Sequence, residues 1–144
     1  MKNISLLTCI IFSLFFIHAL HAQEILHKQF NDAILTLGTD YARTQDGPVL
    51  KIKYPPIIID NPNYGTYREV EQYDFLDGFC EARHFFIPVA LKQKFIDGLN
   101  KKFGFRDEHL WVDHHKNHIA IKEHDDNFEL MVWTPAYEKM LDNR

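Results

Sequence analysis

Two stretches of the chain place their apolar residues at helical spacing. In the first, such residues recur at steps of three and four, as on one face of a helix. They are Leu26, Phe30, Ala33, Ile34, Leu37 and Tyr41. We therefore predict a helix over residues 24–43, ended by Asp46-Gly47-Pro48. The second stripe comprises Leu91, Phe95, Leu99 and Phe103 and predicts a helix over residues 88–103, opened by Pro88 and followed by Gly104.

Six other stretches alternate apolar and polar residues or are rich in β-forming residues, which predicts strands. They are residues 49–54, 67–76, 79–87, 109–114, 118–123 and 128–133. Asp77-Gly78 lies between the second and third and is a strong hairpin signal. We expect residues 57–64 to form a loop and the tail from Ala136 to form a helical turn.

The order of these elements indicates the fold class. Strands grouped between helices favour an antiparallel sheet with helices on one face. We therefore predict an α+β fold: a single domain, a mostly antiparallel sheet and two helices packed on one face, in the order α-βββ-α-βββ. The order repeats at the level of elements, although no repeat of residues accompanies it.

The first 22 residues have the composition of a secretory signal peptide. Lys2 precedes a nearly continuous apolar run from Ile4 to Leu20, and Ala22 stands before Gln23. We expect cleavage after Ala22, which leaves residues 23–144 as one exported domain, periplasmic or secreted, with no membrane span. A membrane anchor and lipidation at Cys9 are the alternatives.

Charge and cysteine content narrow the function classes. The formal net charge is −4 at pH 7, which argues against nucleic acid as the partner. If Cys9 leaves with the signal peptide, Cys80 has no intramolecular partner, so we expect a small buried thiol. No sequence motif indicates a cofactor, and we expect none.

Five of the nine histidines lie between residues 109 and 124, within the predicted C-terminal meander. Turns at Lys116-Asn117 and Asp125-Asp126 would pair Trp111 with Lys122 and Lys122 with Glu129. The same registers place an apolar set inside, namely Leu110, Val112, Ile119, Ile121, Phe128, Leu130 and Val132. They place a second set outside, namely Trp111, Lys122, Glu129, Met131, Trp133, His115 and His118.

Three interpretations of this outer set remain open. It can be a solvated sheet face, or it can be a surface that binds another protein, since aromatic residues and Met are enriched at interfaces. The third interpretation is a metal site. Its candidate ligands are His109, Asp113, His115, His118 and His124.

A further candidate pair comes from the predicted Asp77-Gly78 hairpin. A two-residue loop places Glu71 opposite His84, and such a carboxylate–imidazole pair can exchange a proton as an acid/base couple. The alternative is a structural ion pair. No nucleophile elbow or P-loop motif accompanies the pair.

These observations lead to three expectations about function. The first is a small exported protein that binds another protein in the cell envelope or outside the cell, as an inhibitor or immunity-type protein does. The second is a metal-binding or hydrolytic protein that uses the His-rich meander. The third is an envelope domain that binds a small ligand.

Overall fold

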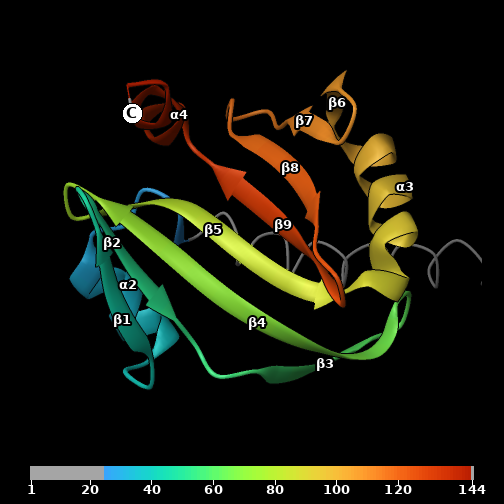
Figure 1. Ribbon diagram of the computed structural model, residues 1–144, viewed down its shortest axis with the longest axis horizontal. Helices are drawn as coiled ribbons and strands as arrows, with labels where there is room; N and C mark the ends of the chain where they lie inside the picture. Colours follow the sequence, from blue (N-terminus) through green and yellow to red (C-terminus); the bar gives the residue numbers. More distant parts are fainter. Residues whose placement is uncertain (1–24, 144) are drawn as a thin grey trace, which may run out of the picture.

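One antiparallel sheet organises the part of the chain that the computed structural model describes, residues 25–143 (Figure 1). The strands are β1 (Ala42–Asp46), β2 (Val49–Lys53), β3 (Ile57–Asn61), β4 (Gly65–Leu76), β5 (Phe79–Pro88), β6 (Gly104–Asp107), β7 (Leu110–Val112), β8 (His118–Glu123) and β9 (Asn127–Trp133). The helices are α2 (Phe30–Leu37), α3 (Lys92–Lys102) after the 3-10 turn η1 (Val89–Leu91), and α4 (Pro135–Asp142). The predicted α+β class is confirmed, and the predicted signal peptide lies outside the described residues.

The predicted helix over residues 24–43 is too long. The helix α2 ends at Leu37, because Gly38 adopts a positive φ of 92° and turns the chain away from the helix axis. Residues 42–46 instead form β1, which pairs with β2 from Ala42↔Lys53 to Asp46↔Val49. Gly47-Pro48 is therefore the two-residue connection of a hairpin.

Two segments that we did not predict as strands join the sheet. Residues 57–61, expected in a loop, form β3 and pair with the first part of β4 from Ile57↔Glu69 to Asn61↔Gly65. This pairing is possible because β4 is 12 residues long and extends beyond its contact with β2. Gly104 follows Phe103, the C-cap of α3, as predicted, but without a positive φ, and it begins β6. The predicted C-terminal helical turn is confirmed as the longer helix α4.

The sheet consists of two halves of like construction. The strand order is β1-β2-β4-β5-β9-β8-β7-β6, with β3 beside β4. Each half is a helix followed by four antiparallel strands of this order: α2 with β1, β2, β4 and β5, and α3 with β6, β7, β8 and β9. The halves meet where β5 pairs with β9. The repeat of elements in the sequence is thus a pseudo-twofold arrangement about the β5–β9 pair.

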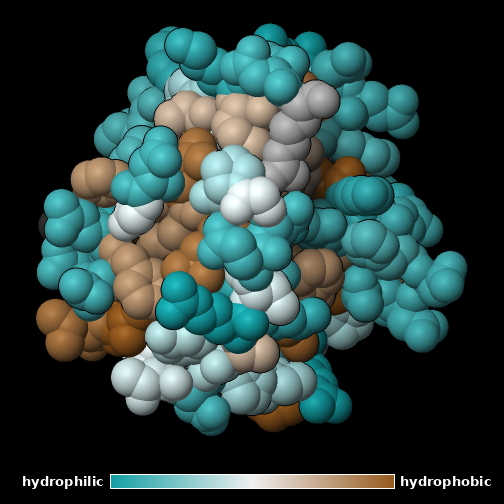
Figure 2. Space-filling view, turned by 60° about the vertical axis from the view of Figure 1, so that its left-hand side comes forward, coloured by the Kyte–Doolittle hydropathy of each residue, from teal (hydrophilic) through white to brown (hydrophobic). Residues whose placement is uncertain are grey.

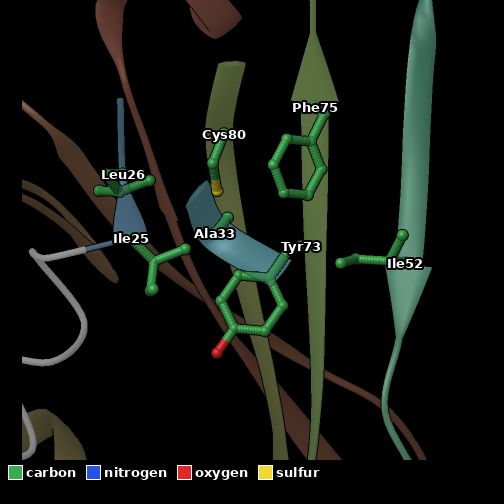
Figure 3. Close-up of a cluster of buried hydrophobic side chains, with 7 residues drawn as sticks. All are labelled: Ile25, Leu26, Ala33, Ile52, Tyr73, Phe75 and Cys80. Atoms are coloured by element: carbon green, nitrogen blue, oxygen red, sulfur yellow. The ribbon is translucent and has the colours of Figure 1, made fainter. Parts of the chain in front are cut away.

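Each half has its own apolar core beneath its helix. Under α2, a set of buried residues from the sheet and the N-terminal segment packs together, as Figure 3 shows. The set comprises Ile25, Leu26, Ala33, Ile52, Tyr73, Phe75 and Cys80. Cys80 is free and fully buried, as predicted, and burial raises the pKa of its thiol.

The core under α3 contains Ile87, Ile96, Leu99, Trp111, Ile119, Ile121 and Phe128. Val132 contacts both cores from β9. Both helices therefore cover the same side of the sheet, which we call the helix face. The prediction of two helices on one face is confirmed.

The other side of the sheet carries α4 at one end. Tyr137 of α4 packs against Val49 and Ala82, with Met131 and Trp133 at the margin of this third cluster. Thr134 caps the helix by accepting the Tyr137 N–H, and its hydroxyl donates to Glu81. Among the described helices, α4 is the one on this side. We call the part that α4 leaves uncovered the open face; it includes Lys51, Lys53, Ile58, Asp60, Arg68, Val70, Gln72, Phe86, Lys122 and His124.

Candidate functional site

A β-bulge decides where the predicted pair of Glu71 and His84 lies. Leu76 pairs with Phe79 as predicted, but Asp74 pairs with Ala82, so Glu81 has no partner on β4. From there on, Gln72 lies opposite His84, and Glu71 lies opposite Phe85. Because side chains alternate across a strand, one extra residue moves Glu71 and His84 to opposite faces of the sheet. The predicted acid/base pair is therefore wrong.

His84 instead lies between two carboxylates at the centre of the sheet. Its Nδ1 lies 2.5 Å from Glu129 Oε1 on β9. Its Nε2 lies 3.3 Å from Asp74 Oδ2 on β4, an ion-pair distance without the angles of a hydrogen bond. Opposite charges on both sides of the ring outweigh the effect of burial and raise the pKa of His84 to about 9.

Asp74 and Glu129 connect His84 to further side chains of the sheet and to α4. Asp74 accepts hydrogen bonds from the Tyr137 hydroxyl, at 2.6 Å, and from the Gln72 amide, at 2.9 Å. Glu129 Oε2 lies 3.3 Å from His124 Nε2, and His124 is exposed. Although burial disfavours carboxylate charge, hydrogen bonds and the charge of His84 keep the pKa values of Asp74 and Glu129 below their ordinary values. This network joins β4, β5 and β9 to α4.

Trp111 lies on the helix face, opposite to its predicted position. It pairs with Ile119, where we predicted Lys122, and its side chain is fully buried. Its indole N–H donates to Asn100 on α3 at 2.8 Å. The register differs from the predicted one by three residues, an odd number, so every side chain of β7 changes face. Leu110 and Val112, predicted inside, lie opposite Ala120 and His118.

The turn from Asp113 to Asn117 causes this change of register. Asp113 is buried, and its Oδ1 accepts the backbone N–H groups of His115 and Asn117, while Oδ2 accepts the Asn117 amide. Lys116 adopts a positive φ of 70° within the turn. The connection is therefore a wide, side-chain-stabilised turn, where we predicted a two-residue turn at Lys116-Asn117.

The predicted metal ligands do not assemble. Asp113 accepts hydrogen bonds from backbone groups within its own turn, and His124 contacts Glu129. His109 stacks on Trp111, and His115 is exposed against His114. Within residues 25–143, no group of three His, Cys, Asp or Glu side chains is placed to hold a metal ion.

The rest of the predicted binding surface shares one side of the sheet. The β8–β9 register is as predicted, with Lys122↔Glu129, Ala120↔Met131 and His118↔Trp133. However, Met131 and Trp133 pack at the margin of the cluster beneath α4. His118 is buried; it contacts the Trp133 ring edge-on and lies 2.9 Å from Glu138 of α4. Of the predicted set, Lys122 belongs to the open face, while His115 is in the exposed turn.

The open face carries positive charge. Lys53, Arg68 and Lys122 are exposed, and none of them forms an ion pair with another described residue. The Lys53 ammonium lies 5.0 Å from the centre of the half-buried Phe86 ring. The neighbouring carboxylate of Glu129 is already engaged by His84 and His124. This face therefore carries three exposed cations, one of them against the ring of Phe86, in a chain whose net charge is negative.

A second polar group, which the sequence did not indicate, lies on the helix face. Tyr67, Glu69, Glu71 and Tyr73 from β4 and Arg83 from β5 share this face, and we call them the Glu69 cluster. Glu69 and Arg83 are both buried. Tyrosine and glutamate occupy every second position of β4 from residue 67 to residue 73, but this pattern does not say which face of the sheet they occupy.

Other exposed apolar side chains are scattered over the surface, and one of them, Ile58, lies opposite Arg68 on the side of the open face. Figure 2 shows the side of the molecule on which α2, β1 and β2 lie, with apolar side chains in the middle and hydrophilic ones around them. Leu35 on α2 is 86% exposed, and Ile58 on β3 is 69% exposed. Scattered apolar residues of this kind are common on soluble proteins and define no site.

Comparison of the chain with the models of known protein families, with curated proteins and with solved structures found no match. No helix formed by residues 25–143 is long and apolar enough to cross a membrane.

Proposed function

We propose that this is an exported protein, periplasmic or secreted, that acts by binding another protein through its open face. The observation that carries the proposal is the unequal covering of the sheet. Both α2 and α3 pack on the helix face, whereas α4 covers only one end of the other side. Exposed side chains of an extended sheet form a broad, rigid surface, which suits recognition of a folded partner.

The charge of the open face supports a partner with an acidic surface. Lys53, Arg68 and Lys122 come from three different strands and share the open face with Phe86. An aromatic side chain within a polar rim is the usual composition of an interface centre. Exposed cations without carboxylate partners accelerate encounter with an oppositely charged protein and fix its orientation.

The proposed mode of action is steric. An inhibitor or immunity-type protein covers a site on its partner, so it needs a rigid complementary surface and no catalytic group. The His84 network gives the open face this rigidity, because it ties three central strands to α4. A bound partner would rest on a surface that does not have to reorganise, which lowers the entropic cost of association.

The test begins with isolation of partners from the host's envelope and secreted fractions on the immobilised protein. Each captured protein is then titrated against wild type and a Lys53→Glu/Lys122→Glu variant. The matched control reverses Lys94 and Lys101 on α3, two exposed lysines on the helix-face side. We expect the open-face variant to weaken binding by about 100-fold and the control to leave it unchanged.

Affinity for a captured acidic protein should also fall as salt concentration rises. Equal affinity for wild type and the open-face variant would overturn the proposal, as would an equal loss in the α3 control. Retention on heparin or on anionic vesicles, lost in the open-face variant without any protein partner, would assign the surface to a polyanion and would also overturn it.

A further inference from the structure

The strand β3 has an open edge. Among the described strands it pairs with β4 alone, so the backbone on its other side forms no ladder with the described part of the chain. Figure 1 shows β3 at the lower margin of the molecule. Unpaired N–H and C=O groups along a strand edge are a template for pairing with a further strand, which comes from another chain when the protein's own strands are used up.

The two ends of the main sheet, β1 and β6, are edges of a different kind. The strand β1 contains Arg43 and Asp46, and β6 contains Arg106 and Asp107. Charged residues on an edge strand oppose pairing with other chains, and native proteins use them for this purpose. The strand β3 begins instead with three consecutive isoleucines, residues 57–59. Of these three edges, β3 therefore has the least protection by charge.

The isoleucines of β3 expose apolar surface on both faces of the sheet. Ile57 and Ile58 are 43% and 69% exposed, and Ile59 is half-buried. Ile58 lies opposite Arg68 on the open face, so Ile57 and Ile59 lie on the helix face. A single exposed apolar residue defines no site. A continuous apolar run along an open edge is different, because one added strand can cover it on both faces.

The sequence of β3 matches itself in an antiparallel pair. A twofold axis perpendicular to the sheet keeps both faces continuous, so it passes through a residue that lies opposite itself. With the axis at Ile58, that residue lies opposite Ile58 of a second copy, and Ile57 lies opposite Ile59. Every isoleucine then faces an isoleucine. An axis at Ile59 would instead set Ile58 against Asp60 and Ile57 against Asn61.

The surroundings of β3 limit the size of such a pair. Pro55 and Pro56 precede the strand and have no amide hydrogen, so the ladder cannot continue past them. A contact of one short strand from each copy buries less than the roughly 1,200 Å² of a stable interface. The association should therefore be reversible, with a Kd between about 1 µM and about 1 mM. Because both copies use the same edge, the contact closes on itself.

We propose that two copies of this chain form a twofold dimer by antiparallel pairing of their β3 strands, with Ile58 of each copy opposite Ile58 of the other. The two sheets then become one, and the two open faces become neighbours on one side of it. The dimer uses the strand edge and needs none of the exposed cations, so it does not depend on the proposed function.

The first test measures oligomeric state with the full-length chain, expressed in a bacterial host and purified as the host processes it. Sedimentation equilibrium between about 1 µM and about 1 mM gives the dimer Kd. Ile58→Lys places two like charges opposite each other on the axis and should raise this Kd at least about tenfold. The matched control is Leu35→Lys on α2, where the native side chain is 86% exposed, and it should leave the Kd unchanged.

Disulfide cross-linking tests the register. Residues directly opposite in a strand pair have Cβ atoms about 5 Å apart, close to the distance in a disulfide. Ile58→Cys should therefore cross-link two chains under mild oxidation. In Ile57→Cys the two new thiols lie diagonally, about 7 Å or more apart, and should react at least about tenfold more slowly. Cys80 is buried, and wild type treated in the same way gives the background of the native cysteines.

The outcomes against the proposal are distinct. Wild type that stays monomeric up to about 1 mM would overturn it, as would equal weakening of the dimer by Leu35→Lys and Ile58→Lys. Cross-linking of Ile57→Cys as fast as that of Ile58→Cys would exclude the proposed register. Assembly beyond the dimer would show a contact that does not close, and pairing of the edge with an extended foreign peptide in a monomeric chain would assign it to another partner; either would overturn the proposal.

Discussion

The His84 network makes the stability of this protein depend on pH in a defined window. The pKa of His84 rises from 6.5 to about 9 on folding, so the folded state binds a proton more tightly than the unfolded chain does. The charged histidine therefore contributes its full stabilisation below pH 6.5 and loses it as the pH rises through about 9. The difference corresponds to about 3 kcal/mol. His84 has 8% of its side chain exposed, so solvent screening reduces this little.

The perturbation that isolates this contribution is His84→Gln. Glutamine can still donate to Glu129, but it carries no charge at any pH. The free energy of unfolding of wild type should fall as the pH rises from 6.5 to above 9. We expect this fall to be about 3 kcal/mol larger in wild type than in the variant. Urea denaturation followed by tryptophan fluorescence measures both proteins across this range. Parallel pH dependences for the two would refute the reasoning, because His84 would then have no special linkage to folding.

Three further predictions concern other buried groups. Glu69→Gln should remove a decline of about 3 kcal/mol in wild-type stability between pH 4.5 and about 7, since the raised pKa of Glu69 favours the folded state only at low pH; wild-type and variant denaturation curves across this range test it. Trp111→Phe should cost about 2 kcal/mol, because it opens a cavity and removes the indole hydrogen bond to Asn100; calorimetric unfolding measures this, and an unchanged midpoint would contradict the buried position. Asp113→Ala should cost about 2 kcal/mol through loss of two backbone N–H acceptors, while Asp125→Ala in the next, exposed turn should cost little; chemical denaturation of the two variants separates the outcomes.

The sequence predicted strand pairing and register correctly where two strands are joined by a short turn with characteristic turn residues. Asp77-Gly78 fixed the β4–β5 hairpin, and the short turn after His124 fixed the β8–β9 register. Alternation then assigned the core side of β8 and β9 correctly, because one face is apolar and the other is not. The apolar stripe from Leu91 to Phe103 likewise predicted the helix α3.

The predictions were wrong where a change in the number of residues in a strand or turn moves side chains to the opposite face of the sheet. The bulge at Glu81 leaves no mark in the residue pattern, yet it separates Glu71 from His84. The turn held by Asp113 is longer than a hairpin loop and reverses β7, so Trp111 becomes a core residue. Short turns are set by local residues, whereas bulges and wide turns depend on the packing around them.

The candidate sites were hard to find for a related reason. Along β4, the positions 67, 69, 71 and 73 and the positions 68, 70, 72 and 74 both mix polar with apolar residues. Alternation therefore could not say which set faces the helices. Only the pairing of β4 with β5 shows that Glu69 and Arg83 share the helix face.

The joining of the two halves through β5 and β9 determines the order in which the sheet can be completed. The first half, from α2 to β5, is synthesised as a unit of neighbouring strands, and β5 is then its edge. The strand that covers this edge, β9, is the last strand of the described chain. The centre of the finished sheet is therefore assembled last. Until residues 127–133 arrive, the backbone of β5 is open to pairing with other chains, so this interval is when the protein is most exposed to misassembly.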